Sequence, residues 1–277
     1  MGGNAFDYVS RIEQKNIMPT LKQEVEPILN KLGIKNYKLL GSALKKDESS
    51  GDLDIGIEWN DVLKALNKSE ISNGFSADLV KELFRNANLS HIPIKFFGAM
   101  ATITIPIIGQ ENEFVQTDLM FFNDLEYGEL AKYSPEKNTS NYKSVIKNFL
   151  FYSIFPVLRF DEKYINDMLV EYKQYMVNDI GMFIKTVNKI NQKKPEKLLK
   201  NFKIINKKFI TSNWNEIWNL ILGPKFKKSD WNSFETLYNF MNSTDFKHND
   251  KLNEIIINFK DALDKNNYKY PKEIEGE

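Results

Sequence analysis

The apolar residues in the first half of the chain recur with two different periods. Helical spacing covers 21–32, with Thr20 and Gln23 as a capping box before it and Gly33 as a stop after it. Further helical spacing covers 61–67 and 76–88, and strand-like runs cover 37–40, 52–59, 94–107 and 114–122. One leading helix, several strands and intervening helices predict an α+β domain with a small mixed sheet.

The pattern changes in the second half, where apolar residues recur almost only at three- and four-residue spacing. Helices are predicted around 145–150, 168–176, 198–209, 214–221, 234–241 and 252–259. The polar end, 265–277, is predicted to fray. The sequence therefore predicts two domains, residues 1–135 with the sheet and residues 136–277 as an all-helical C-terminal domain.

Two carboxylates stand one residue apart in the second predicted strand. Residues two apart in a strand point to the same face, so Asp52 and Asp54 face one way while Leu53 and Ile55 face a core. Adjacent like charges repel each other unless a divalent cation bridges them. A third carboxylate, Asp118, lies within the apolar run 114–122. This pattern favours a metal-dependent enzyme.

A Gly-Ser turn precedes the acidic pair. Gly41-Ser42 ends a short apolar run, and Asp52-Leu53-Asp54 follows after a polar loop. Together with Asp118, this arrangement resembles the DNA polymerase β-like nucleotidyltransferase superfamily, over roughly 37–122. The segments 2–6 and 134–143 are similar to phage-encoded members of that superfamily. The resemblance implies a nucleotidyltransferase fold for the first domain and a helical domain that binds substrate or nucleotide.

The resemblance also implies roles for individual residues. Asp52 and Asp54 would contact two Mg²⁺ ions, or Mn²⁺ as an alternative, together with a bound nucleoside triphosphate such as ATP. Asp118 would hold only the ion on the acceptor side and take the acceptor's proton. The nucleotide would be bound by five further residues: Gly41, Ser42, Ser140, Tyr142 and Lys143.

Composition narrows the class of protein. The 277 residues are 42% hydrophobic and 13% aromatic, which predicts a globular chain. There is no cysteine, which excludes disulfides and thiolate zinc sites and fits a cytoplasmic location, the host cytoplasm if the chain is phage-encoded. The two histidines, His91 and His248, are poorly suited to a histidine-based site. No apolar run reaches membrane-spanning length, and the first twelve residues do not resemble a signal peptide.

The net charge of +1 conceals a lysine-rich segment, Lys185 to Lys208, which holds nine lysines and one acid. On a helix, Lys189, Lys193, Lys197 and Lys200 would share a face and could hold RNA phosphates. The leading hypothesis is therefore transfer of a nucleotide, without a template, to an RNA 3′ end, a form of RNA modification. The alternatives are nucleotidylation (AMPylation) of a protein in a toxin-like or phage–host role, and modification of a small molecule.

Overall fold

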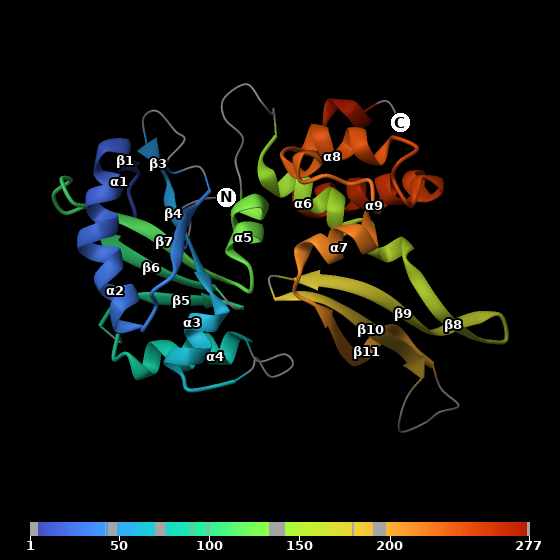
Figure 1. The fold of residues 1–277 in the computed structure, drawn as a ribbon, viewed down its shortest axis with the longest axis horizontal. Coiled ribbons are helices and arrows are strands. Elements are labelled where there is room, and N and C mark those ends of the chain that lie inside the picture. The colour runs from blue at the N-terminus through green and yellow to red at the C-terminus, as the bar shows by residue number, and fades with distance from the viewer. Residues whose placement is uncertain are drawn as a thin grey trace. The chain divides into compact units, whose positions relative to one another are not determined.

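The computed structural model describes residues 5–41, 43, 49–69, 76–89, 91–98, 100–132, 142–178, 180–190 and 198–275. The chain divides into two compact units, Met1–Ser134 and Pro135–Glu277. Both units contain helices and strands (Figure 1), which confirms the α+β class. The roles that the sequence assigns to residues 1–135 and 136–277 stay predictions.

A five-stranded mixed sheet forms the centre of the first unit, with the strand order β2-β4-β7-β6-β5. Its strands are β2 (Tyr37–Leu40), β4 (Asp52–Glu58), β5 (Ile94–Phe97), β6 (Met100–Pro106) and β7 (Phe114–Phe122). Strands β4 and β7 are parallel, and the other neighbours are antiparallel. A separate two-stranded ribbon pairs β1 (Ile12–Glu13) with β3 (Ser49–Ser50).

The burial of these strands follows their sequence patterns. In β4, Leu53, Ile55 and Ile57 are fully buried and alternate with polar or small residues. In the central strand β7, nearly every residue is buried, because both of its faces are covered. The four strand predictions for this unit are confirmed, including the interruption at Gly98.

The leading helix begins earlier than the capping box predicted. Helical structure runs through α1 (Gln14–Thr20), a π-helical turn (Leu21–Val25) and α2 (Glu26–Lys31), and it ends with Gly33 at a φ of +76°. Thr20 is fully buried inside this run, and its hydroxyl accepts a hydrogen bond from the Ile108 amide at 3.0 Å. The predicted start at Thr20 is therefore wrong, because the hydroxyl serves a tertiary contact. The unit is completed by α3 (Trp59–Ala65), α4 (Ser76–Asn86) and α5 (Leu125–Lys132).

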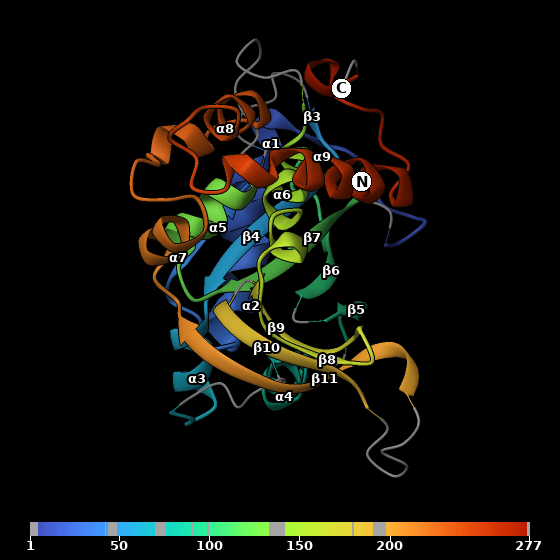
Figure 2. The same cartoon turned by 90° about the vertical axis from the view of Figure 1, so that its right-hand side faces the viewer.

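The second unit contains a four-stranded antiparallel sheet (Figures 1 and 2), so the prediction of an all-helical domain is wrong. Its strands are β8 (Arg159–Ile165), β9 (Met168–Asn178), β10 (Gly181–Ile190) and β11 (Leu198–Thr211). The helices predicted over 168–176 and 198–209 are strands β9 and β11. The other helix predictions are confirmed by α6 (Ser144–Tyr152), α7 (Trp214–Ile221), α8 (Phe234–Met241) and α9 (Leu252–Lys265).

Strand β9 shows why the helical interpretation failed. Met168, Leu169, Tyr172 and Met176 fit a helix spacing, yet the buried side chains are Val170, Tyr172 and Gln174, which alternate with a period of two. Strand β11 is an edge strand that is exposed on both faces. Its sequence therefore shows no alternation of apolar and polar residues that would mark it as a strand. One consequence is that Lys189 and Lys200, which the sequence grouped on one helical face, do not share one. Lys189 and Lys200 lie on different strands, and Lys193 and Lys197 lie outside the described residues.

The end of the chain packs against the second unit, which corrects the prediction of a frayed tail. Ile274 is fully buried. The Tyr142 hydroxyl donates to Glu273 Oε2 at 2.8 Å and accepts from the Lys272 amide at 2.9 Å. These contacts are non-local, so a polar sequence rich in lysine gave no sign of them. Across the described part of the chain, none of the helices combines the length and apolarity that crossing a bilayer requires.

A buried carboxylate fixes the turn that leads into β2. Asp61, in α3, accepts hydrogen bonds from the Lys35 and Asn36 amides at 2.9 and 2.7 Å. Burial by itself would raise the pKa of Asp61, but these backbone hydrogen bonds outweigh it and the pKa is lowered. The turn before β2, the strand that Gly41 follows, therefore depends on an ionised side chain.

We predict that Asp61→Ala lowers the free energy of unfolding at neutral pH by about 1–3 kcal/mol, because two backbone amides lose their charged acceptor. A carboxyl group with a lowered folded pKa stabilises the fold above its ordinary pKa and loses that effect as the pH falls through the folded pKa. The difference between wild type and variant should therefore narrow on acidification, as measured by urea unfolding. Asp61→Asn, which keeps one acceptor oxygen, is the matched control and should cost less. A difference that does not change with pH would contradict the role of the charge.

Candidate metal centre

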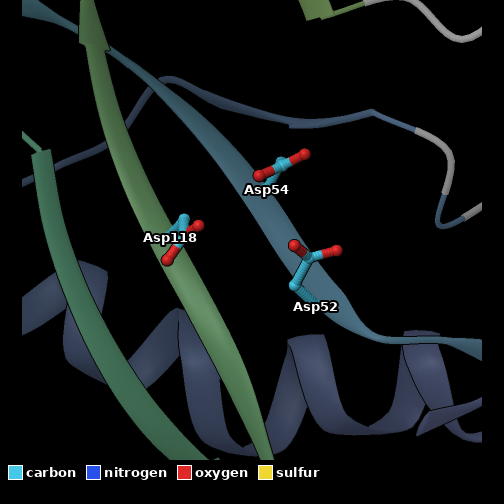
Figure 3. Close-up of side chains that lie close together, drawn as sticks. All are labelled: Asp52, Asp54 and Asp118. Carbon is cyan, nitrogen blue, oxygen red and sulfur yellow. The ribbon is translucent and has the colours of Figure 1, made fainter. Parts of the chain in front are cut away.

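Three carboxylates from two adjacent strands converge on one point of the first unit. Asp52, Asp54 and Asp118 each offer an oxygen atom, and these atoms all lie within 4.8 Å of one another. Figure 3 shows the three side chains on the same side of β4 and β7. Asp118 is buried, and the other two are half-buried. The cluster therefore has one side closed by the sheet and another side open to a ligand.

The strand register brings the acids together. In the parallel pair of β4 and β7, Asp54 lies opposite Asp118 and Asp52 lies opposite Gln116. Directly opposed residues in neighbouring strands point to the same face. The opposite face of β4 is fixed by its buried aliphatic side chains, so a shift of one residue would bury the acids and expose the core. The hydrophobic pattern of β4 thus holds the carboxylates in place.

Gly41 touches this cluster directly. Leu40 pairs with Asp54 across β2 and β4, and Gly41 follows it with a φ of +68°. A Cβ atom placed on Gly41 would lie 2.5 Å from Asp54 Oδ2, which is too close for any real carbon–oxygen contact. The backbone conformation therefore favours glycine, and any larger residue would force the Asp54 carboxylate to move from its place in the cluster.

The ribbon of β1 and β3 anchors the chain just before β4 begins. The Arg11 side chain donates to Ser49 through Nε at 2.9 Å and through Nη2 at 2.8 Å, to the hydroxyl and the carbonyl respectively. Ser50 is buried, and its hydroxyl donates to the Asp52 carbonyl at 2.9 Å. These contacts set the point at which β4 begins, and therefore the position of Asp52.

Gln116 orients the buried carboxylate. Its Nε2 donates to Asp118 Oδ1 at 3.1 Å, and its Oε1 accepts from the Ala5 amide at 2.8 Å. The backbone donor at Ala5 fixes which end of the amide faces Asp118. Lys95 Nζ donates to the Ala5 carbonyl and lies 4.8 Å from the Phe6 ring centre. The N-terminal segment is thus connected to the acidic cluster through one side chain.

The electrostatics of Asp118 reflect its place beneath two other acids. Burial raises the pKa of Asp118, and the charge of Asp52 raises it further. The polar side chains of Thr102 and Gln116 and the charge of Lys132 act in the opposite direction without cancelling the rise. The ionised form of Asp118 is therefore disfavoured in the absence of a cation.

The donor set fits a hard divalent cation. Three carboxylates supply oxygen ligands only, and no nitrogen or sulfur donor belongs to the cluster as the described residues form it. Mg²⁺ and Mn²⁺ prefer such ligands, and Mg²⁺ keeps several waters, so few protein ligands suffice. The open side of the cluster leaves room for those waters or for phosphate oxygens.

The other predicted site residues are placed differently. Gly41 lies beside Asp54, while Ser42 and Ser140 lie outside the described residues. Tyr142 and Lys143 belong to the second unit, where Lys143 is exposed before α6 and the Tyr142 hydroxyl is bonded to the C-terminal segment. Their part in nucleotide binding stays a prediction.

Sequence reasoning missed Gln116 and the contact between Gly41 and Asp54. Gln116 could have been found from its spacing, because it lies two residues before Asp118 in the same strand and so shares its face. Its partner at Ala5, 111 positions away in the chain, could not have been found in that way.

Comparison with known proteins finds a structural similarity at low sequence identity. No model of a known protein family matches the sequence, and no curated protein matches it. Among solved structures, the chain is similar to Leishmania infantum polymerase beta, in a crystal structure of a ternary P/T complex. The two are 13% identical, with a TM-score of 0.37, and the match covers 80% of this chain and 76% of the other. The function is therefore inferred from the side chains of this chain.

We predict that Gly41→Ala abolishes Mg²⁺ binding, because the new Cβ would displace the Asp54 carboxylate. Gly98→Ala is the matched control: Gly98 also has a positive φ, +61°, but nothing lies within 4 Å of the added atom. Both variants should lose about 1–2 kcal/mol of stability from the left-handed backbone. Only Gly41→Ala should lose the metal-dependent rise in melting temperature. Equal metal responses in the two variants would contradict the contact with Asp54.

We also predict that Asp118→Asn raises the melting temperature of the metal-free protein at neutral pH. A carboxyl group with a raised folded pKa destabilises the fold once it ionises, so the gain should disappear as the pH falls below the ordinary carboxyl range. Mg²⁺ should stabilise wild type more than the variant. The control is Asp261→Asn, since Asp261 is exposed on α9 of the second unit. A metal-free variant less stable than wild type would show that Asp118 is structural.

Proposed function

We propose that this chain is a metal-dependent nucleotidyltransferase, which moves a nucleoside monophosphate from a nucleoside triphosphate such as ATP to an acceptor hydroxyl. The observation that carries the proposal is the cluster of Asp52, Asp54 and Asp118 on two paired strands, with oxygen atoms within 4.8 Å of one another. A buried strand pair that presents three mutually repelling acids to an open side is well suited to cations and phosphates.

Each acid has a proposed part in the reaction. Two Mg²⁺ ions, when bound, would supply positive charge to the attacking and leaving oxygens. Asp52 and Asp54 would hold both ions and orient the triphosphate, while Gly41 and Ser42 would leave its phosphates close to backbone amides. Asp118 would hold the acceptor-side ion through one oxygen and take the proton of the acceptor hydroxyl. A bond forms between that hydroxyl oxygen and the α-phosphorus, and pyrophosphate leaves.

The acceptor that we propose is an RNA 3′ end, modified without a template. The support for RNA is the lysine-rich sheet of the second unit, where β10 and β11 carry Lys185, Lys189, Lys200, Lys203, Lys207 and Lys208. Within the described residues, no ion pair neutralises these six lysines. Phosphates of an RNA chain are the natural counterions for such a surface. The cytoplasm, with its triphosphates and RNA, is the location that we propose.

The test is to incubate the protein with each labelled nucleoside triphosphate, Mg²⁺, and total RNA or total protein from a host extract. We expect label in the RNA. Loss of a residue that only supports a metal ligand typically lowers activity roughly 10- to 100-fold. Asp52 is proposed to bind the metal directly, so Asp52→Ala should lower labelling by more than that. Asp261→Asn should leave it unchanged. Label in protein, or in a small molecule, would overturn the RNA acceptor. Labelling that survives Asp52→Ala would overturn the proposed metal centre.

A further inference from the structure

A row of side chains crosses all four strands of the sheet in the second unit. Arg159 lies opposite Gln174, Gln174 lies opposite Lys185, and Lys185 lies opposite Lys207. Opposed residues share a face, so the four side chains form one line across the sheet. We call this line the basic row. It contains three cations and no carboxylate.

The four members of the basic row differ in exposure. Gln174 is buried, and its amide donates to the Phe155 carbonyl at 2.6 Å, so this part of the row is covered by its own unit. Lys185 is half-buried and Lys207 is exposed. The end of the row on β10 and β11 is therefore open to a ligand.

Lys185 and Lys207 repel each other. Like charges directly opposite in a sheet are destabilising, and no carboxylate of the described residues forms an ion pair with either one. Burial lowers the pKa of Lys185, and the charge of Lys207 lowers it further. An anion between the two ammonium groups would remove this repulsion, much as a cation would in the acidic cluster of the first unit.

Aromatic rings flank this lysine pair on both sides. Phe209, two residues from Lys207, is 45% exposed and lies opposite Phe183, with the ring centres 5.3 Å apart. On the other side, Phe202 contacts Tyr172 at 4.9 Å between ring centres, and Lys189 Nζ lies 4.5 Å from the centre of the Phe202 ring. On β11, the Phe209 ring is thus followed by Lys207, then by the aliphatic pair of Ile204 with Val187, and then by the Phe202 ring with Lys189, so rings and cations alternate with one aliphatic pair between them.

This alternation matches the chemistry of a single-stranded nucleic acid. Unpaired bases stack on aromatic side chains, while the phosphates between them lie against lysines. We infer that the open end of the basic row binds single-stranded RNA, with a phosphate between Lys185 and Lys207 and a base against Phe209. The inference rests on the proposed function, since it takes RNA as the acceptor, and it names the residues that would hold that acceptor.

The test is fluorescence anisotropy of the full chain with a labelled single-stranded oligoribonucleotide of about 12 nucleotides, at several salt concentrations. Each phosphate contact to a single strand contributes about 0.7 to the slope of log K against log salt. Lys185→Ala with Lys207→Ala removes the one phosphate site between the two lysines, so it should reduce the slope by about 0.7. The matched control is Lys265→Ala with Lys269→Ala. These exposed lysines lie at the end of α9 and just after it, outside the sheet, and their loss should leave the slope unchanged.

Two single variants separate binding from folding. Lys207→Glu puts a carboxylate opposite Lys185, so the melting temperature should be unchanged or higher while RNA binding is lost. Phe209→Leu keeps an apolar side chain and should weaken binding roughly tenfold, through the lost stacking. RNA affinity that survives Lys207→Glu, or a control pair that loses as much slope as the tested pair, would overturn the inference. So would tighter binding of the matching DNA or of heparin, which has no bases.

The binding assay contains neither Mg²⁺ nor triphosphate, which keeps its outcome distinct from that of the transfer reaction. If binding depends on Lys185 and Lys207 but no nucleotide is transferred, the inference stands and the proposed function fails. If nucleotide is transferred to RNA but the lysine pair does not affect binding, the proposed function stands and the inference fails.

Discussion

The first unit is organised around the mutual repulsion of three carboxylates that the sheet holds together. Asp54 lies opposite Asp118 because β4 and β7 pair in parallel, and that pairing is fixed by the buried residues on the other face of β4. The core thus sustains an arrangement that is unfavourable by itself. A cation would turn the repulsion into attraction, which is why a metal centre is the most economical interpretation of the site.

The surroundings of the acids make the arrangement specific. Gly41 leaves the space that Asp54 occupies, Ser50 holds the start of β4, and Gln116 fixes one oxygen of Asp118. Each contact acts on a different aspartate: Ser50 bonds the backbone of Asp52, Gly41 leaves space for the side chain of Asp54, and Gln116 bonds the carboxylate of Asp118. Restraint of this kind lowers the cost of organising a ligand shell, because the side chains need not search for their positions when the ion arrives.

The second unit presents the opposite charge in a similar manner. Strand pairing sets Lys185 against Lys207, and the neighbouring rows of the sheet carry aromatic rings. Acids and cations are thus concentrated by the same means, the register of adjacent strands, in two separate units. The net charge of +1 does not reveal either cluster, because the negative charges in one unit and the positive charges in the other cancel in the sum over the chain.

The sequence by itself determined the local features. The alternation in β4 put Asp52 and Asp54 on one face, the apolar run at 114–122 indicated the strand that carries Asp118, and Gly33 marked the end of a helix; all three depend on residues within a few positions of one another. Tertiary structure decided the rest. The Ala5 amide binds Gln116, and Gly41 lies against Asp54, only because the folded chain brings these distant residues together. The segments that contain Tyr172 and Phe202, predicted as helices, form strands of a sheet. The reason is that strand pairing joins segments that are distant in the chain. The periodicity of one segment therefore does not specify which strand it pairs with or in which register.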